Sequence, residues 1–143
     1  MDEELRQAFH SRVEKEPLAS KFGLKLLEVR EGYSKVEMKF RQDMENMFGT
    51  AHGAALFALI DEAFETAVNS HGTLAVALNV NVTFVGSPRP GSILRAEARE
   101  VSLTRKTASY DIKIHDERGD LIATCMALAY RKRHPLPFDQ RSG

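Results

Sequence analysis

The stretch from His52 to Val68, HGAALFALIDEAFETAV, constrains the fold more than any other part of the chain. It is almost uninterrupted in its apolar character, rich in alanine and leucine, and longer than an ordinary strand. These properties predict a buried α-helix. Near its middle stands Asp61. A carboxylate in such a helix needs a partner, access to water or a chemical role.

Segments with the two-residue period of β-strands lie on both sides of this helix. In residues 24–41, Val36, Met38 and Phe40 alternate with charged residues, which predicts a half-exposed strand. After the helix, turn-forming residues separate four further strand-like stretches, which we expect to form a four-strand meander. They cover residues 74–86, 93–103, 106–116 and 121–133.

This order of elements predicts an α+β protein. A helix so apolar must be covered on several sides, and a strongly curved antiparallel sheet wrapped around it would do so, as in the hotdog fold. We expect residues 1–143 to form one domain. Residues 1–20 would be an N-terminal amphipathic helix, limited by Pro17, with a linker, and residues 134–143 would be a loose tail.

Composition excludes several classes of protein. The formal net charge is zero, so no global charge favours binding to nucleic acid or to an acidic membrane surface. No apolar run is as long as a membrane span, and the N-terminus lacks the pattern of a signal peptide. The single cysteine, Cys125, fits a reducing compartment and is expected to be a buried, inert thiol. These features predict a cytoplasmic protein without membrane or nucleic-acid partners.

The stretch NMFGTAHGAALFALIDEAF resembles the signature of the phenylacetate-degradation (PaaI-like) branch of hotdog thioesterases. That branch has an Asn in the loop, His-Gly-Gly at the helix start and an Asp nine residues after the His. The matching residues are Asn46, His52-Gly53 and Asp61, whereas Ala54 replaces the second glycine. The resemblance extends more loosely from about Gly23 to Arg131. It implies a hotdog acyl-thioester hydrolase whose sites are shared within a dimer.

The start of the predicted helix suits the binding of a thioester carbonyl. Helix N-termini present unpaired backbone N–H groups and the positive end of the dipole, and Gly53 has no side chain to obstruct a ligand. An oxyanion that develops there would be stabilised. Asn46 is a candidate second donor or an ordinary turn residue. His52 is a candidate donor or simply the residue that caps the helix.

Asp61 is too far along the helix to act at its own Gly53. The two residues are eight positions apart, or about 12 Å at the rise of an α-helix. If both act in one site, two copies of the helix must pack antiparallel, which predicts a homodimer. Hotdog dimers often pair again, so a homotetramer is also expected from the resemblance.

Asp61 is the candidate general base or nucleophile. Its neighbours at three and four residues are mostly apolar but include Glu65, and both features should raise its pKa. The sequence does not choose between the two roles, although we favour the base. Glu65 is a weaker alternative for the catalytic carboxylate. Both Glu62 and Glu65 are expected to be solvated or to contact the partner in the dimer.

A coenzyme A ester would need cations for its phosphates and an apolar pocket for its acyl group. Arg89, Arg105 and Lys106 are the candidate phosphate ligands, with a third basic group at residues 131–133. Phe57 is the candidate acyl contact. Three residues near the loop, Met44, Met47 and Phe48, would line the same pocket or belong to the core.

The leading hypothesis is an acyl-CoA thioesterase acting on aryl-acetyl or medium-chain acyl groups. One alternative is a non-catalytic module that binds or senses acyl-CoA, and another is a dehydratase of hydroxyacyl thioesters on the same fold. The histidines show no metal-ligand spacing, and the chain lacks a phosphate loop and a serine nucleophile motif. We therefore expect no metal and no cofactor.

Overall fold

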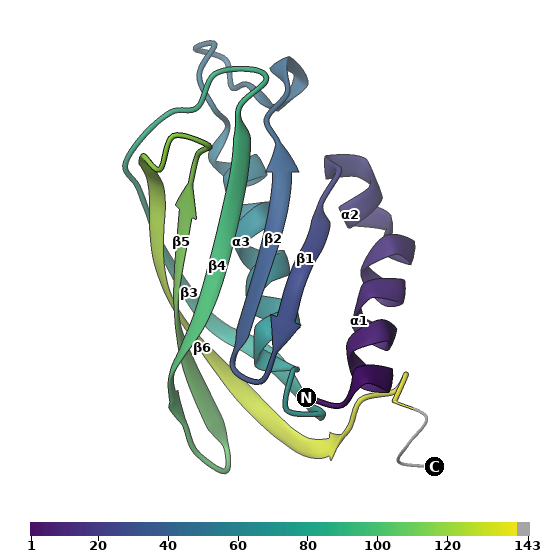
Figure 1. The fold of residues 1–143 in the computed structure, drawn as a ribbon. Coiled ribbons are helices and arrows are strands. Elements are labelled where there is room, and N and C mark those ends of the chain that lie inside the picture. The colour runs from purple at the N-terminus through teal and green to yellow at the C-terminus, as the bar shows by residue number, and fades with distance from the viewer. Residues whose placement is uncertain (140–143) are drawn as a thin grey trace.

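The computed structural model describes residues 1–139, which form a curved antiparallel sheet, a long helix against it and a shorter pair of helices at one side (Figure 1). The helices are α1 (Glu3–Lys15), α2 (Pro17–Phe22), the 3-10 turn η1 (Gln42–Met44) and α3 (Gly53–Val68). The strands are β1 (Lys25–Arg30), β2 (Tyr33–Lys39), β3 (Thr73–Phe84), β4 (Ile93–Leu103), β5 (Thr107–His115) and β6 (Leu121–Pro135). The predicted hotdog arrangement is confirmed.

The sheet has the strand order β1-β2-β4-β5-β6-β3. Strands β4, β5 and β6 form a meander, but β3 pairs with β6 rather than with β4. The prediction of a four-strand meander was therefore wrong. The chain crosses between β3 and β4 through the loop at residues 85–92 and leaves β3 at an edge of the sheet. Residues 24–41, in which the alternating pattern predicted a half-exposed strand, contain two strands, β1 and β2.

A register shift in β3 changes which of its residues face α3. Pairing with β6 is irregular between Ala77 and Asn79, and Leu78 is left out of the ladder. Beyond this bulge Val80 and Val82 pair with Ala127 and Cys125, both of which are buried. Before it, Val76 pairs with half-exposed Tyr130 on the other face. The even-numbered apolar residues of β3 thus do not share one face, because a bulge reverses the alternation.

Helix α3 supplies the centre of the core. Leu59, Ile60, Ala63 and Ala67 are fully buried, and α3 contacts β2, β4 and β5. This burial explains the apolar composition of the helix, since the sheet covers most of its circumference. Among residues 1–139, no helix combines the length and the apolar character needed to cross a bilayer. One exposed stripe remains on α3, and it consists of Ala54, Phe57, Asp61 and Glu65.

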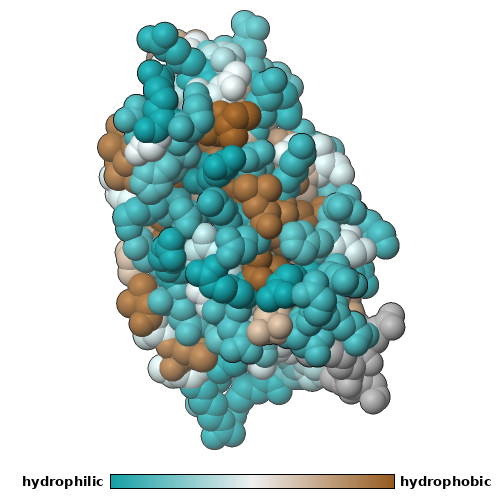
Figure 2. Space-filling model, in the orientation of Figure 1, coloured by the Kyte–Doolittle hydropathy of each residue, from teal (hydrophilic) through white to brown (hydrophobic). Residues whose placement is uncertain are grey.

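The opposite face of the sheet is mostly polar. Figure 2 shows a largely hydrophilic surface on this side of the molecule, with a narrower apolar strip near its middle. Here Arg95 pairs with Glu37 at 2.9 Å, and Glu97 accepts hydrogen bonds from the Tyr33 hydroxyl and from Arg99. The alternation between buried and charged residues in β2 and β4 therefore reflects one face toward α3 and one toward solvent.

Residues 17–20 and 134–139 are more ordered than the sequence indicates. Residues 17–20, expected to belong to a linker, lie in α2, which begins at a proline suited to the first helical turn. In the tail, Leu136 is buried and the Phe138 ring meets the Phe9 ring of α1 edge-on at 5.4 Å between centroids. The expectation of a loose tail is therefore wrong for residues 134–139, and residues 140–143 lie outside the described part.

Candidate active site

The N-terminus of α3 is capped by His52. Its Nδ1 atom accepts a hydrogen bond from the Ala54 N–H at 3.0 Å, and its carbonyl accepts from Ala55 and Leu56. Since Nδ1 is the acceptor in this hydrogen bond, Nε2 is the ring nitrogen that can donate. The cap leaves the Gly53 N–H without an acceptor among residues 1–139. The helix start therefore offers two donors to a ligand, the Gly53 N–H and the His52 Nε2–H.

Asn46 organises the loop that leads into the helix. Its Oδ1 atom accepts from the N–H groups of Phe48 and Thr50, and its Nδ2 atom donates to Thr50 Oγ1 at 3.0 Å and to the Ala51 carbonyl at 3.4 Å. Both side-chain N–H groups are thus used within the loop. Of its two predicted roles, this geometry matches that of the turn residue.

Phe84, at the end of β3, is a neighbour of the site that sequence reasoning missed. A Cβ atom added to Gly53 would lie 3.1 Å from Phe84 Cζ and 3.2 Å from Cε2. The half-exposed ring therefore closes over the glycine and limits the room at the helix start. No sequence pattern marks this contact, because it depends on β3 lying beside α3 although 31 positions separate the two residues.

Asp61 is partly exposed on the α3 stripe, one turn after Phe57. Burial raises the pKa of the Asp61 carboxyl above its usual range, and the negative charge of Glu16 raises it further. The predicted direction of the shift is confirmed. The acidic neighbour named from the sequence was Glu65, whereas the largest charge effect on Asp61 comes from Glu16, at the junction of α1 and α2.

A cavity of about 350 Å³ lies beside Asp61, between α1, α3, the start of β3 and the tail. Most of its wall is apolar, while Arg12, Glu16 and Glu65 add charge. Such a volume suits a small acyl or aryl group. The apolar residues of the wall include Phe9, Val13, Phe64, Leu74, Leu136 and Phe138.

The structure brings Asn46, His52 and Gly53 together at one end of α3 and places Asp61 farther along it. The residues predicted to contact the acyl group fall into exposed and buried ones. Phe57 is 38% exposed on the same stripe, and Met47 and Phe48 protrude from the loop, but Met44 is a core residue. Glu62 is only 4% exposed, so the expectation that it is solvated was wrong. Its carboxyl group lies near those of Glu16, at the α1–α2 junction, and Glu65.

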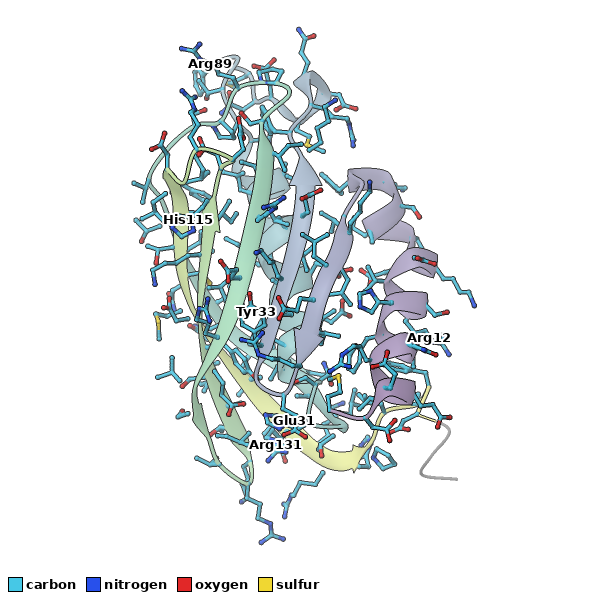
Figure 3. The ribbon with its side chains drawn as sticks, viewed as in Figure 1. Arg12, Glu31, Tyr33, Arg89, His115 and Arg131 are labelled. Atoms are coloured by element: carbon cyan, nitrogen blue, oxygen red, sulfur yellow. The ribbon has the colours of Figure 1, made fainter. Side chains whose placement is uncertain are left out.

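The predicted phosphate ligands lie at opposite ends of the sheet. Arg89 belongs to the loop after β3, near the helix start, because the Ser87 hydroxyl of that loop accepts from the Ala51 N–H. Figure 3 shows Arg89 and Arg131 far apart at the two ends. Arg105 and Lys106 form the β4–β5 turn, where Arg131 donates to the Thr104 carbonyl. Arg105, Arg131 and Arg133 line a second cavity of about 490 Å³.

Comparison with known proteins decides the family. Residues 48–123, more than half of the chain, match the family model of the Thioesterase superfamily. The chain belongs to this superfamily. It is 40% identical over 113 residues to a candidate esterase of Archaeoglobus fulgidus, a match that covers 79% of this chain and 73% of the relative. It is 30% identical over 125 residues to the acyl-coenzyme A thioesterase PaaI of Escherichia coli, which covers 87% of this chain and 89% of PaaI.

Solved structures of the superfamily agree. The Escherichia coli PaaI structure matches with a TM-score of 0.86 and 29% identity over 90% of this chain and 94% of that one. A variant of PaaI from Thermus thermophilus matches with a TM-score of 0.78 and 36% identity over 81% and 99% of the two chains. The chain is thus a PaaI-like hotdog thioesterase, an enzyme that hydrolyses thioesters.

Proposed function

We propose that this thioesterase hydrolyses acyl-CoA, releasing a carboxylic acid and free CoA, at two identical sites shared across a homodimer. The observation that carries the proposal is the Gly53 N–H at the capped start of α3, which has no acceptor within residues 1–139 and has the His52 ring beside it. These donors suit the oxyanion of a thioester under attack. The relative named as an acyl-coenzyme A thioesterase supports the choice of CoA as the thiol.

The exposed surface of α3 and β3 supports the dimer. The stripe containing Phe57 and Asp61 is not covered by the chain's own sheet. Strand β3, at the sheet edge, carries exposed Leu78 and Phe84 and has a strand neighbour on one side only within residues 1–139. Long apolar edges are normally covered in native proteins. Antiparallel pairing of two β3 strands would cover both edges and bring each Asp61 toward the partner's helix start.

In the proposed reaction, Asp61 is the general base. It removes a proton from a water whose oxygen attacks the thioester carbonyl carbon. The carbonyl electrons move to the oxygen, which accepts from the Gly53 N–H and the His52 Nε2–H of the other subunit. When the tetrahedral intermediate collapses, the C–S bond breaks and the CoA sulfur leaves with the proton. Direct attack by the Asp61 carboxylate, through an anhydride, is the alternative that the geometry leaves open.

The parts of the substrate are assigned by environment. The cavity beside Asp61 would bind an aryl-acetyl or medium-chain acyl group. Phe57 would contact this group near its carbonyl. The subunit that supplies Gly53 would also supply Arg89 to bind the phosphates of CoA. The subunit that supplies Asp61 would supply Arg105 and Lys106 for the same purpose. Their separation within one chain supports the assignment of these cations to separate subunits.

Further assembly and location are also proposed. Met126, Leu128 and Tyr130 are partly exposed on the outer face of β6, and this apolar strip supports the pairing of dimers into a tetramer.

We propose that residues 1–143 act as one domain in the cytoplasm, since the one cysteine, Cys125, is buried and unpaired.

The raised pKa of Asp61 predicts the pH dependence of the reaction. Only the carboxylate accepts a proton, so kcat/KM should fall as the pH drops through a pKa above the usual range of aspartate. Glu16→Gln removes a negative charge that raises this pKa and should move the acid limb to lower pH. Glu31→Gln, on the β1–β2 turn, is the matched control. Both pH profiles are measured with a metal chelator present. If the acid limb of kcat/KM lies at the same pH in Glu16→Gln and in the wild type, a group other than Asp61 causes it.

The function itself is tested by thiol release from a panel of aryl-acetyl and aliphatic acyl-CoAs. We expect release from at least one of these esters and a matching amount of free acid. Tight binding of the same esters without release would instead favour the non-catalytic acyl-CoA module. Formation of a double bond from a hydroxyacyl-CoA, with the thioester intact, would favour the dehydratase.

A further inference from the structure

Three carboxylates from two parts of the chain meet beside α3. Glu16 lies at the junction between α1 and α2, whereas Glu62 and Glu65 project from the middle of α3. One oxygen from each carboxylate can be chosen so that all three lie within 4.8 Å of one another. The sequence spacing did not indicate this cluster, because Glu16 is 46 positions from Glu62 and reaches it only through the packing of the N-terminal helices.

Glu62 makes the cluster different from an ordinary acidic surface. Its residue is 4% exposed, and its Oε2 atom is buried without a hydrogen-bond partner among residues 1–139. Burial, followed by the neighbouring Glu65 and Glu16, strongly raises the pKa of the Glu62 carboxyl. Within that part of the chain, none of the three carboxylates pairs with a Lys, Arg or His. A buried carboxylate without a partner is costly and calls for a compensating charge or proton.

We propose that Glu16, Glu62 and Glu65 bind a divalent cation, and that Ca²⁺ fits best. Ca²⁺ takes oxygen ligands at roughly 2.3–2.6 Å in flexible geometry, so ligand oxygens up to about 5 Å apart can share one ion. Mg²⁺ demands shorter distances and a stricter octahedron, which makes it the weaker match. Water would complete the coordination from the side of exposed Glu65.

The bound cation would lie at the wall of the cavity that Asp61 also lines. Glu16 and Glu65 belong to that wall, and Asp61 is close enough for its charge to raise the pKa of Glu65. A positive ion at this point would favour the ionised form of Asp61 and would fasten the α1–α2 junction to α3. Cation binding is measured without substrate, so its outcome is independent of the proposed hydrolysis of acyl-CoA.

The test is calorimetric titration of chelator-treated protein with CaCl₂, MgCl₂ and MnCl₂, together with the thermal midpoint in each salt. We expect about one Ca²⁺ per chain and a raised midpoint for the wild type. Glu62→Gln keeps the shape of the side chain and removes its charge, and it should weaken Ca²⁺ binding at least tenfold. Glu31→Gln, an exposed residue on the β1–β2 turn, should bind Ca²⁺ as the wild type does.

Two results would overturn the site. The first is a wild type that neither binds a divalent cation nor gains thermal stability from one, which would mean that the carboxylates share protons instead. The second is equal binding by the wild type and Glu62→Gln. If Glu62→Gln does not fold, as judged by circular dichroism, Glu65→Gln at the exposed position of the cluster takes its place with the same expected loss.

Discussion

Replacement of Asp61 by asparagine should lower kcat/KM for acyl-CoA hydrolysis by about a hundredfold or more. Asparagine keeps the size of the side chain but accepts no proton at neutral pH and is a poor nucleophile, so both proposed roles of Asp61 are lost. Because Asp61 is on the exposed stripe of α3 rather than in the core, the fold should survive the change. The measurement is thiol release from the best substrate of the panel, with wild type and variant at equal concentration.

The control for this change is Asp120→Asn, which makes the same substitution in the exposed β5–β6 turn. It should leave the rate within about twofold of the wild type, as most exposed substitutions have small effects. Size-exclusion chromatography would establish that Asp61→Asn still assembles as the wild type does. If Asp61→Asn retains more than a tenth of the wild-type kcat/KM, the carboxylate is not the base or the nucleophile.

Gly53→Ala should reduce kcat/KM by an amount on the order of a hundredfold, which is typical of damage to one oxyanion donor. The new methyl group would lie 3.1 Å from Phe84 Cζ, closer than ordinary van der Waals contact, so the ring has to shift at the helix start where the substrate carbonyl is proposed to bind. The N–H remains, but the approach to it is narrowed. Kinetics over a range of substrate concentrations would show whether the loss falls on kcat, as displacement of the oxyanion requires.

Ala54→Gly is the matched control for Gly53→Ala, since it changes one methyl group at the adjacent position. Ala54 is exposed, and its N–H is already used by the His52 cap. This variant should keep the activity within severalfold of the wild type and lose a little stability through the added freedom of glycine. Equal losses in the two variants would mean that the helix start tolerates neither change for structural reasons, and the oxyanion role of Gly53 would lose its support.

The sequence predicted the parts of the structure that depend on local pattern. The apolar run predicted the bounds of α3. The two-residue period of the strands placed most ends of β3 to β6 within about two residues of their observed positions. The capping alternative for His52 was correct because capping requires only a suitable side chain at the first turn. The upward shift in the pKa of Asp61 followed from its apolar neighbours on the helix.

Features that depend on long-range packing were not predictable in the same way. A helical wheel places Glu62 beside Asp61, but only the sheet and the α1–α2 junction determine that Glu62 is buried and Asp61 is not. The edge position of β3 depends on its pairing with a strand much later in the chain. The contact between Phe84 and Gly53 follows from that pairing. Candidate site residues were thus found by motif, while their surroundings required the fold.

Each active site is proposed to combine Gly53 of one subunit with Asp61 of the other. The most direct test is to mix the two inactive variants, Asp61→Asn and Gly53→Ala, after reversible dissociation, and to measure thiol release. In a shared site, each mixed dimer contains one intact site and one doubly altered site. Random exchange of equal amounts should therefore restore roughly a quarter of the wild-type activity. If the mixture exchanges subunits but stays as inactive as its components, the two residues do not act across the dimer.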